Sequence, residues 1–237
     1  MPSDSLSTRA LVSRSCFLVL AWIGITAALF GIGQFVVHTH AITDFDRHVT
    51  NWVIDRRTPV LDTTMKVITW IGSWVAVAVT GAVVLVLTLT KRLTVAALVL
   101  FVVAWAGEYT AVNLVKHAVG RPRPPMRLWL VTAHGASFPS GHTANATLVC
   151  TALTVAAFLF SGQRPVRAVT VTIACLVIVA VGFSRVELGV HWTTDVIGGG
   201  LVALVWLATI AAAFGTSVAR TVPGTGADES GTQHSTV

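Results

Sequence analysis

Long apolar stretches without a charged residue dominate this sequence and decide what it can fold into. A helix needs about 20 residues to cross the ~30 Å hydrocarbon core of a membrane. Four uncharged stretches reach this length, at residues 16–37, 67–90, 143–162 and 196–214. Of the 237 residues, 54% are hydrophobic and 11% are charged, whereas soluble domains carry about a quarter charged residues. The sequence therefore predicts an all-α protein that is integral to a membrane.

Two further stretches bring the expected number of spans to six. Residues 93–115 are interrupted only by Glu108, which either supports the basic residues after it or packs against a neighbouring span. Residues 168–183 are short for a span, but Arg167 and Arg185 flank them and can extend their side chains to the membrane surface. We predict a single domain built as a six-helix membrane bundle.

The two ends of the chain are expected to lie outside this bundle, which we place at residues 16–214. Residues 1–15 precede the first span, and residues 215–237 are rich in Gly, Thr and Ser without an apolar period, which predicts a disordered tail. The first apolar stretch is longer than the ~7–15 residues of a cleavable signal, so we interpret it as a retained anchor.

A short amphipathic segment separates the first two spans. Apolar residues recur there at helical intervals, at Phe45, Val49, Trp52 and Val53. Charged residues occupy the other face, at Asp44, Asp46, Arg47 and Asp55. The pattern favours a helix that lies on the membrane surface, with a solvated connector as the alternative. Pro59 is expected to break the chain before the second span.

The formal net charge of +6 does not indicate a nucleic-acid partner, because the basic residues stand at helix ends and in short loops and form no basic block. Anionic lipid head groups fit this distribution better. The three cysteines lie inside apolar stretches without CxxC or metal-ligand spacing, so we assign neither a disulfide nor a metal to Cys16, Cys150 and Cys175.

Three polar clusters fall on one face of a six-span bundle. The first begins with Lys116 at the end of the third span and continues into the proline-rich segment Gly120-Arg121-Pro122-Arg123-Pro124. Prolines stop the helix and stiffen the segment, so its guanidinium groups have little conformational freedom to lose. Arginine forks match phosphate oxygens and lysine adds a point charge, which indicates phosphate recognition. Taken alone, basic residues at a span end more often anchor a helix at the interface.

The second cluster is Pro139-Ser140-Gly141-His142, where a loop turns into the fourth span. Free backbone N–H groups at a helix start can bind an anion, a glycine permits close approach, and the Ser140 hydroxyl can add a donor. An isolated Ser-Gly pair would be interpreted as a simple helix cap. His142 beside such an anion site is well placed to protonate a leaving oxygen.

The third cluster is Ser184-Arg185, followed by His191 and Asp195. The i, i+4 spacing of His191 and Asp195 predicts neighbours on one helical face. There the carboxylate can accept the imidazole Nδ1–H and leave Nε2 free to attack an electrophile. On its own, such a pair is more often a helix cap with an incidental partner.

A zinc site built from His142, His191 and Asp195 is a competing interpretation. The basic residues on the same face would repel a cation and attract an anion, and no H-x-x-x-H spacing is present. We therefore expect a site that uses no metal and no cofactor.

In order and in internal spacing, the three clusters resemble the signature motifs of the type 2 phosphatidic-acid phosphatase superfamily. That superfamily includes bacterial prenyl-pyrophosphate phosphatases and, more distantly, vanadium-dependent haloperoxidases. The resemblance covers residues 40 to 205 and implies a six-helix membrane core that needs no metal. It also implies a site on the extracytoplasmic face with both termini in the cytoplasm, an orientation that the nearly even distribution of basic residues leaves open.

The resemblance also implies a role for each motif residue. His191 is then the nucleophile, Asp195 orients it, and His142 is the general acid. The residues expected to hold the phosphoryl oxygens are Lys116, Arg123, Ser140, Gly141 and Arg185. The implied activity is a lipid phosphatase that works through a phosphohistidine. Its substrate would be undecaprenyl or another polyprenyl pyrophosphate, phosphatidylglycerol phosphate or phosphatidic acid.

Other functions would use similar residues. A haloperoxidase would hold vanadate in the same pocket, but such enzymes are soluble and this chain has too few polar residues. A lipid transporter or flippase, or a phosphotransferase, could also place lysine, arginine and histidine side chains inside a helix bundle. The connecting loops favour no one lipid substrate and no oligomeric state.

Overall fold

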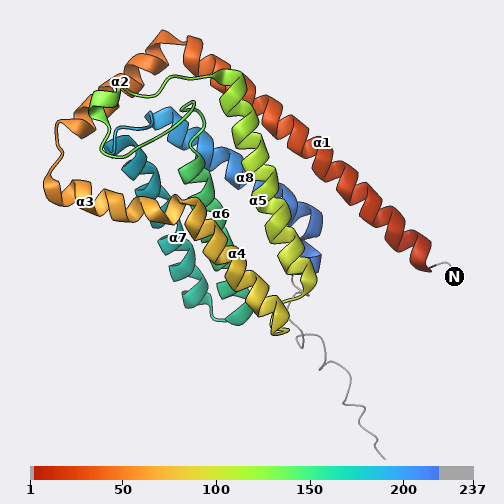
Figure 1. Cartoon of the computed structure of the whole chain (residues 1–237). Helices are drawn as coiled ribbons and strands as arrows, with labels where there is room; N and C mark the ends of the chain where they lie inside the picture. The colour runs from red at the N-terminus through yellow and green to blue at the C-terminus, as the bar shows by residue number, and fades with distance from the viewer. Residues whose placement is uncertain (1–2, 219–237) are drawn as a thin grey trace, which may run out of the picture.

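The computed structural model describes residues 3–218, and within this range the chain forms helices and 3-10 turns with no strand (Figure 1). The elements are α1 (Ser3–His38), α2 (His40–Ile54), α3 (Pro59–Ile68), η1 (Thr69–Gly72), α4 (Trp74–Leu89), α5 (Val95–Val119), η2 (Met126–Leu128), α6 (Gly141–Phe160), α7 (Arg164–Glu187) and α8 (Thr193–Val218). Five helices are long and apolar enough to cross a membrane, and the bent pair that includes α4 supplies a sixth. The predicted all-α membrane bundle is therefore confirmed.

The helices extend beyond the apolar stretches that predicted them. The fifth span, expected at residues 168–183, belongs to the 24-residue helix α7, which has Arg185 in its last turn. Lys116 lies in the last turn of α5 and Asp195 in the first turn of α8. The terminal turns of these helices contain polar residues, so a search for apolar stretches makes the helices too short. The tail expected at 215–237 begins inside α8, and residues 219–237 lie outside the described range.

The predicted amphipathic helix is present as α2, but its buried face is not the expected one; its location on the membrane surface stays a prediction. Asp46 is fully buried together with Thr50 and Val53, whereas Phe45 and Trp52 are about half exposed. Placing Asp46 on the exposed charged face was therefore wrong. An apolar period assigns residues to the two faces of a helix by polarity alone. It could not show that Asp46 has polar partners inside the protein, which is why this residue is buried. Figure 1 shows α2 crossing the end of the bundle at which α1 ends.

The second span is broken, and Pro59 begins a helix where the sequence predicted only a chain break. Pro59 is at the start of α3, which Thr58 caps. After α3 the chain passes through η1 and enters α4 at an angle of 44°. The break lies beside the start of α6, because Asn145 Nδ2 donates to the Gly72 carbonyl at 3.1 Å. It thereby brings the hydroxyl of Thr69 to the end of the bundle where the polar clusters meet.

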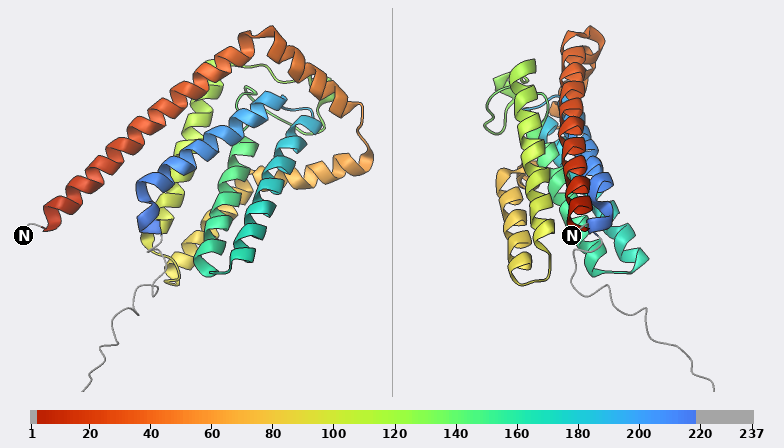
Figure 2. Two further views of the ribbon diagram at one scale, coloured as in Figure 1. Left: turned by 180° about the vertical axis from the view of Figure 1, so that it is seen from behind. Right: turned by 90° about the vertical axis from the view of Figure 1, so that its right-hand side faces the viewer.

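The helices pack closely where small residues face one another. α6 lies between α7 and α8, and α1 runs along α5 and α8 (Figure 2). Gly199 of α8 faces the backbone of Ser140 so closely that a β-carbon would overlap the Ser140 carbonyl. Gly198 lies against the ring of Phe138, which is fully buried. Gly198 and Gly199 therefore allow α8 to pack closely against the start of α6 and the residues before it.

The loop that carries His191 is held by an arginine from the α2–α3 connection. Arg57 Nε donates to the Glu187 carbonyl at 2.8 Å, and Arg57 Nη1 donates to the Leu128 carbonyl at 3.0 Å. Gly189 begins the turn to His191 with φ 73°, a conformation that residues with a side chain rarely adopt. One side chain thus fixes the α7–α8 and α5–α6 loops relative to each other.

Candidate active site

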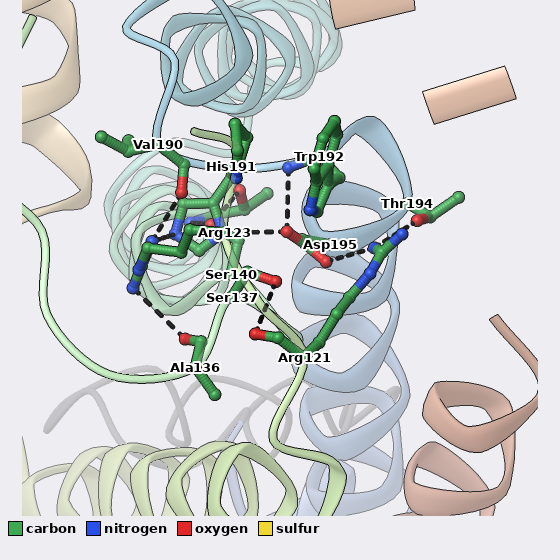
Figure 3. Close-up of polar contacts among 12 residues, drawn as sticks. Arg121, Arg123, Ala136, Ser137, Ser140, Val190, His191, Trp192, Thr194 and Asp195 are labelled. Atoms are coloured by element: carbon green, nitrogen blue, oxygen red, sulfur yellow. Dashed lines mark hydrogen bonds and ion pairs between the residues drawn. The ribbon is translucent and has the colours of Figure 1, made fainter. Parts of the chain in front are cut away.

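The three predicted clusters meet at one end of the bundle, and each comes from the end of a different helix (Figure 3). Figure 3 shows the loop after α5, the start of α6 and the turn between α7 and α8 converging there. The charged and histidine side chains predicted for the site are Lys116, Arg123, His142, Arg185, His191 and Asp195. The site is therefore assembled by tertiary packing from motifs up to 79 positions apart, because Lys116 and Asp195 belong to α5 and α8.

His191 and Asp195 contact each other, although not as two residues on one helical face. His191 is 2% exposed and precedes α8, which begins at Thr193. The Asp195 carboxylate, in the first turn, reaches back so that its Oδ2 lies 3.3 Å from His191 Nδ1. The same oxygen accepts the Trp192 N–H at 2.8 Å. The Asp195 carboxylate therefore caps α8 and also contacts the imidazole of His191. The helix cap and the histidine–carboxylate pair, which the sequence offered as alternatives, are both present.

The contacts of His191 define its tautomer. Arg123 Nη1 lies 3.0 Å from His191 Nε2. A guanidinium can only donate, so Nε2 must accept and carries no proton. The ring proton is then on Nδ1, facing Asp195. Nε2 is left with a lone pair that points into the basic cluster, as a nitrogen nucleophile requires.

Burial and charge keep this imidazole neutral. Burial lowers the pKa of His191 well below its ordinary value, and the cations Lys116, Arg123 and Arg185 lower this pKa further. Burial also lowers the pKa of the Arg123 guanidinium, which Asp195 partly opposes. An arginine stays protonated at any physiological pH, so the cationic surroundings of His191 persist.

Backbone carbonyls hold two of the cations in place. Lys116 Nζ donates to the Ala136 carbonyl at 2.8 Å. Arg123 donates through Nη1 to the Val190 carbonyl at 2.6 Å and through Nε to the Gly135 carbonyl at 3.0 Å. Carbonyl dipoles orient these cations but leave their charge uncompensated.

The third cation is held less completely. Arg185 is 4% exposed, and its Nη1 donates to Thr69 Oγ1 at 2.8 Å. Its Nε is buried with no hydrogen-bond partner among the described residues. A buried N–H without a partner costs about 1–3 kcal/mol. This donor is therefore available to a ligand.

None of these three cations has a carboxylate oxygen within 4.0 Å in the described part of the chain. Buried charges are normally paired, so three unpaired cations together favour an anionic ligand. Among residues 3–218, no three His, Cys, Asp or Glu side chains are grouped so that they could hold a metal ion.

The Pro-Ser-Gly-His segment forms the amino-terminal end of α6. Ser140 is the cap, because its Oγ accepts the Thr143 N–H at 3.4 Å and the Thr143 hydroxyl at 3.1 Å. The Ser140 N–H donates to the Asp195 carbonyl at 2.9 Å, which joins the start of α6 to the start of α8. Gly141 and His142 are the first two residues of the helix, and His142 is partly exposed. Phosphate binding by Ser140 and Gly141 stays a prediction.

Sequence reasoning missed three polar residues that surround Asp195. Arg121 Nη1 donates to Asp195 Oδ1 at 2.5 Å, and Arg121 Nη2 donates to Asp46 Oδ2 at 2.6 Å. Thr194 donates its N–H to Asp46 Oδ1 at 3.0 Å. Arg121 lies inside the first motif. Asp46 lies on the same side of α2 as Thr50 and Val53, the side that is buried. This helical spacing was the one sign in the sequence that Asp46 could be buried.

Glu108 lies apart from this network. Its side chain is 2% exposed, and its Oε2 has no hydrogen-bond partner among the described residues. Lys116 bonds to the Ala136 carbonyl, and Asn113 Nδ2 bonds to the Tyr109 carbonyl at 2.7 Å. The burial of Glu108 places it on the packed face of α5, and in the described part of the chain no hydrogen bond joins it to the basic residues that follow it.

Comparisons with known proteins agree with this arrangement. The family model described as the PAP2 superfamily matches residues 96–219. Over 167 residues the chain is 30% identical to phosphatidylglycerophosphatase B of Bacillus subtilis (strain 168), an alignment that covers 69% of this chain and 80% of that protein.

Two solved structures are similar in fold. The crystal structure of a transmembrane PAP2 type phosphatidylglycerolphosphate phosphatase from Bacillus subtilis superposes with a TM-score of 0.64 and 27% identity, covering 84% of this chain and 94% of that one. The structure of Aquifex aeolicus LpxE superposes with a TM-score of 0.55 and 22% identity, covering 71% of this chain and 93% of that one. At this identity, the second similarity concerns the fold alone.

Proposed function

The chain belongs to the PAP2 superfamily of lipid phosphatases, and we propose that it hydrolyses the terminal phosphate of a membrane lipid through a phosphohistidine intermediate. The observation that carries the proposal is the contact of His191 Nε2 with Arg123 Nη1, within a group of cations that have no carboxylate partner among residues 3–218. A phosphoryl group is the anion whose oxygens these cations would bind while its phosphorus meets the nitrogen lone pair.

The first step transfers the phosphoryl group to His191. Phosphate oxygens bind among Lys116, Arg123 and Arg185, and the Arg123 N–H that now contacts Nε2 shifts to a phosphate oxygen. Nε2 attacks phosphorus in line, the P–N bond forms, and the bond from phosphorus to the lipid oxygen breaks. Asp195 accepts the Nδ1–H throughout, and its negative charge stabilises the ring as the ring becomes cationic.

The second step releases phosphate. In the first step His142 gives its proton to the departing lipid oxygen, so it is a base when the second step begins. It then takes a proton from a water molecule that attacks the phosphohistidine, which frees inorganic phosphate and returns Nε2 to its neutral state. The amino-terminal N–H groups of α6, next to Ser140 and Gly141, would bind a phosphoryl oxygen in both steps.

Phosphatidylglycerol phosphate is the first substrate to test, because the similar sequence and the similar structure from Bacillus subtilis are both named for the hydrolysis of this lipid. Polyprenyl pyrophosphates and phosphatidic acid present the same terminal group and complete the panel. We also propose that the site faces the extracytoplasmic side and that both termini are cytoplasmic. The start of α1 and the end of α8 lie at the opposite end of the bundle from the site (Figure 1).

The decisive experiment is phosphate release from these lipids in detergent micelles by purified wild-type protein and by His191→Ala. We expect the variant to lose release entirely and to keep the wild-type elution volume in size-exclusion chromatography. His117→Ala is the matched control, because His117 is exposed near Lys116 on the same helix and, among the described residues, bonds only to the Asn113 carbonyl. Release by His191→Ala at the rate of the control would contradict the mechanism. Lipid movement across vesicles without phosphate release would favour a flippase.

A further inference from the structure

We propose that Asp46 and Arg121 form a positioning relay through which the amphipathic helix α2 holds Asp195, and through it His191, in the geometry for attack. The inference rests on the proposed function, because it assigns the relay to the same reaction. Neither residue touches His191 by any hydrogen bond in the described chain. Their effect passes through Asp195.

Arg121 joins two carboxylates that come from helices far apart in the sequence. Its guanidinium is 4% exposed, and its two terminal nitrogens bond to Asp195 Oδ1 at 2.5 Å and Asp46 Oδ2 at 2.6 Å. The guanidinium is planar and rigid, so two short bonds from one fork fix both carboxylates relative to each other. The orientation of Asp195 is therefore set from α2 as well as from its own helix.

Asp46 holds the start of α8 at a second point. Besides Arg121, it accepts the Thr194 N–H at 3.0 Å and the Thr194 hydroxyl at 2.5 Å. Thr194 Oγ1 in turn accepts from Arg121 Nη1 at 2.8 Å, which closes a ring of bonds around the residue next to Asp195. Both carboxylate oxygens of Asp46 accept hydrogen bonds in this ring. An asparagine in its place would set its NH₂ group against one of these donors.

The charges of the relay also suit the reaction. Arg121 alone would neutralise Asp195, whereas Asp46 offsets Arg121 and leaves the group of three with a net negative charge. That charge faces His191 through Asp195 Oδ2, where the imidazole becomes cationic when it is phosphorylated. All members of the group are at most 4% exposed, so solvent screens this interaction little.

The test compares Asp46→Asn with Asp44→Asn in the full-length protein. Asp44 is on the same helix, but its side chain is 69% exposed and, within the described range, bonds only to Arg47, so the control removes an equal charge without touching the relay. We expect Asp46→Asn to lower kcat about 10- to 100-fold, as displaced supporting residues commonly do, with KM within about threefold of wild type. The folded fraction, measured by size-exclusion chromatography and thermal unfolding, normalises kcat.

Two arginine variants separate positioning from general support of the fold. Arg121→Gln removes both ion pairs, whereas Arg121→Lys keeps the charge but replaces the rigid planar fork by a point charge on a flexible stem. We expect the lysine to recover part of the kcat that the glutamine loses. The double variant Asp46→Asn with Arg121→Gln should match Arg121→Gln within about threefold, because two residues of one relay do not contribute independently. Multiplied losses in the double variant would overturn the relay.

If Asp46→Asn does not fold, Thr194→Val carries the test, because it removes the hydroxyl bonds and keeps the backbone bond to Asp46. We expect kcat about three- to tenfold below wild type, from the loss of the hydroxyl's two charge-assisted hydrogen bonds, one to Asp46 and one from Arg121. If wild type releases phosphate and His191→Ala does not, the proposed function stands. A kcat for Asp46→Asn or Thr194→Val equal to that of Asp44→Asn would then overturn the relay and leave the proposed function intact. No release by wild type would overturn the proposed function and the relay with it.

Discussion

Asp195→Asn tests how the carboxylate controls the histidine. Asp195 accepts from three donors, with Arg121 Nη1 on Oδ1 at 2.5 Å, and His191 Nδ1 at 3.3 Å and Trp192 N–H at 2.8 Å on Oδ2. Asparagine offers one acceptor and one donor, so either orientation sets its NH₂ group against donors. If the amide oxygen keeps Arg121, the NH₂ group faces His191, which must then accept at Nδ1 and carry its proton on Nε2. The lone pair needed for attack is lost.

The magnitude follows from these contacts. A histidine held in the wrong tautomer by an Asp-to-Asn change loses about 10⁴-fold in kcat, which is about 5 kcal/mol at ~1.36 kcal/mol per factor of ten. The folded state also loses one partner of a buried ion pair, which costs about 3–5 kcal/mol. Asp46 still pairs with Arg121 at 2.6 Å, so we expect the lower end of that range.

The assay is phosphate release in micelles, with the free energy of unfolding measured on the same samples. Asp55→Asn, an exposed carboxylate next to α2, is the control and should keep wild-type kcat. An Asp195→Asn variant that folds and retains more than about a tenth of wild-type kcat would refute the assignment of the Nδ1–H tautomer, since correct tautomer control is worth about 10⁴.

Three further outcomes are expected. Because burial and the neighbouring cations lower the pKa of His191, the imidazole stays neutral as the pH falls through its ordinary range. The acid limb of kcat/KM, after allowance for the substrate's own ionisation, should therefore lie well below pH 6.5. An acid limb at or above this value would contradict a nucleophilic His191. Gly199→Ala sets a β-carbon against the Ser140 carbonyl and should lower the free energy of unfolding by about 1–3 kcal/mol, whereas Gly200→Ala meets its nearest atom at 3.7 Å and should be tolerated. Arg123→Lys keeps the charge but loses the guanidinium fork that bonds to the backbone carbonyls, so kcat/KM should fall about 100-fold in a steady-state assay. An unchanged kcat/KM would show that phosphate binding does not depend on that fork.

The fold could be predicted because its signal is local: an uncharged stretch of about 20 residues reports a span by itself, and the all-α membrane bundle is confirmed. The candidate site residues were predicted from three motifs taken together, because each cluster alone favours a helix cap or an interface anchor. The structure brings these three clusters to one end of the bundle.

What could not be predicted depends on partners far along the chain. Asp46 looks like a solvated residue until Arg121, 75 positions away, is placed beside it. The break at η1 follows from the close approach of Gly72 to the backbone of His142, a contact between separate spans that no apolar period reports. Hydropathy measures the average surroundings of a residue, whereas these positions are decided by one specific neighbour.

The order of the site residues along the chain also sets the order in which they are synthesised. Lys116, Arg123 and Arg185 all precede residue 188, whereas His191 and Asp195 follow it. A growing chain therefore acquires these three cations before His191, the proposed nucleophile, and Asp195. A chain that ends at residue 188 would carry the cations of the site without the residue proposed to attack phosphorus.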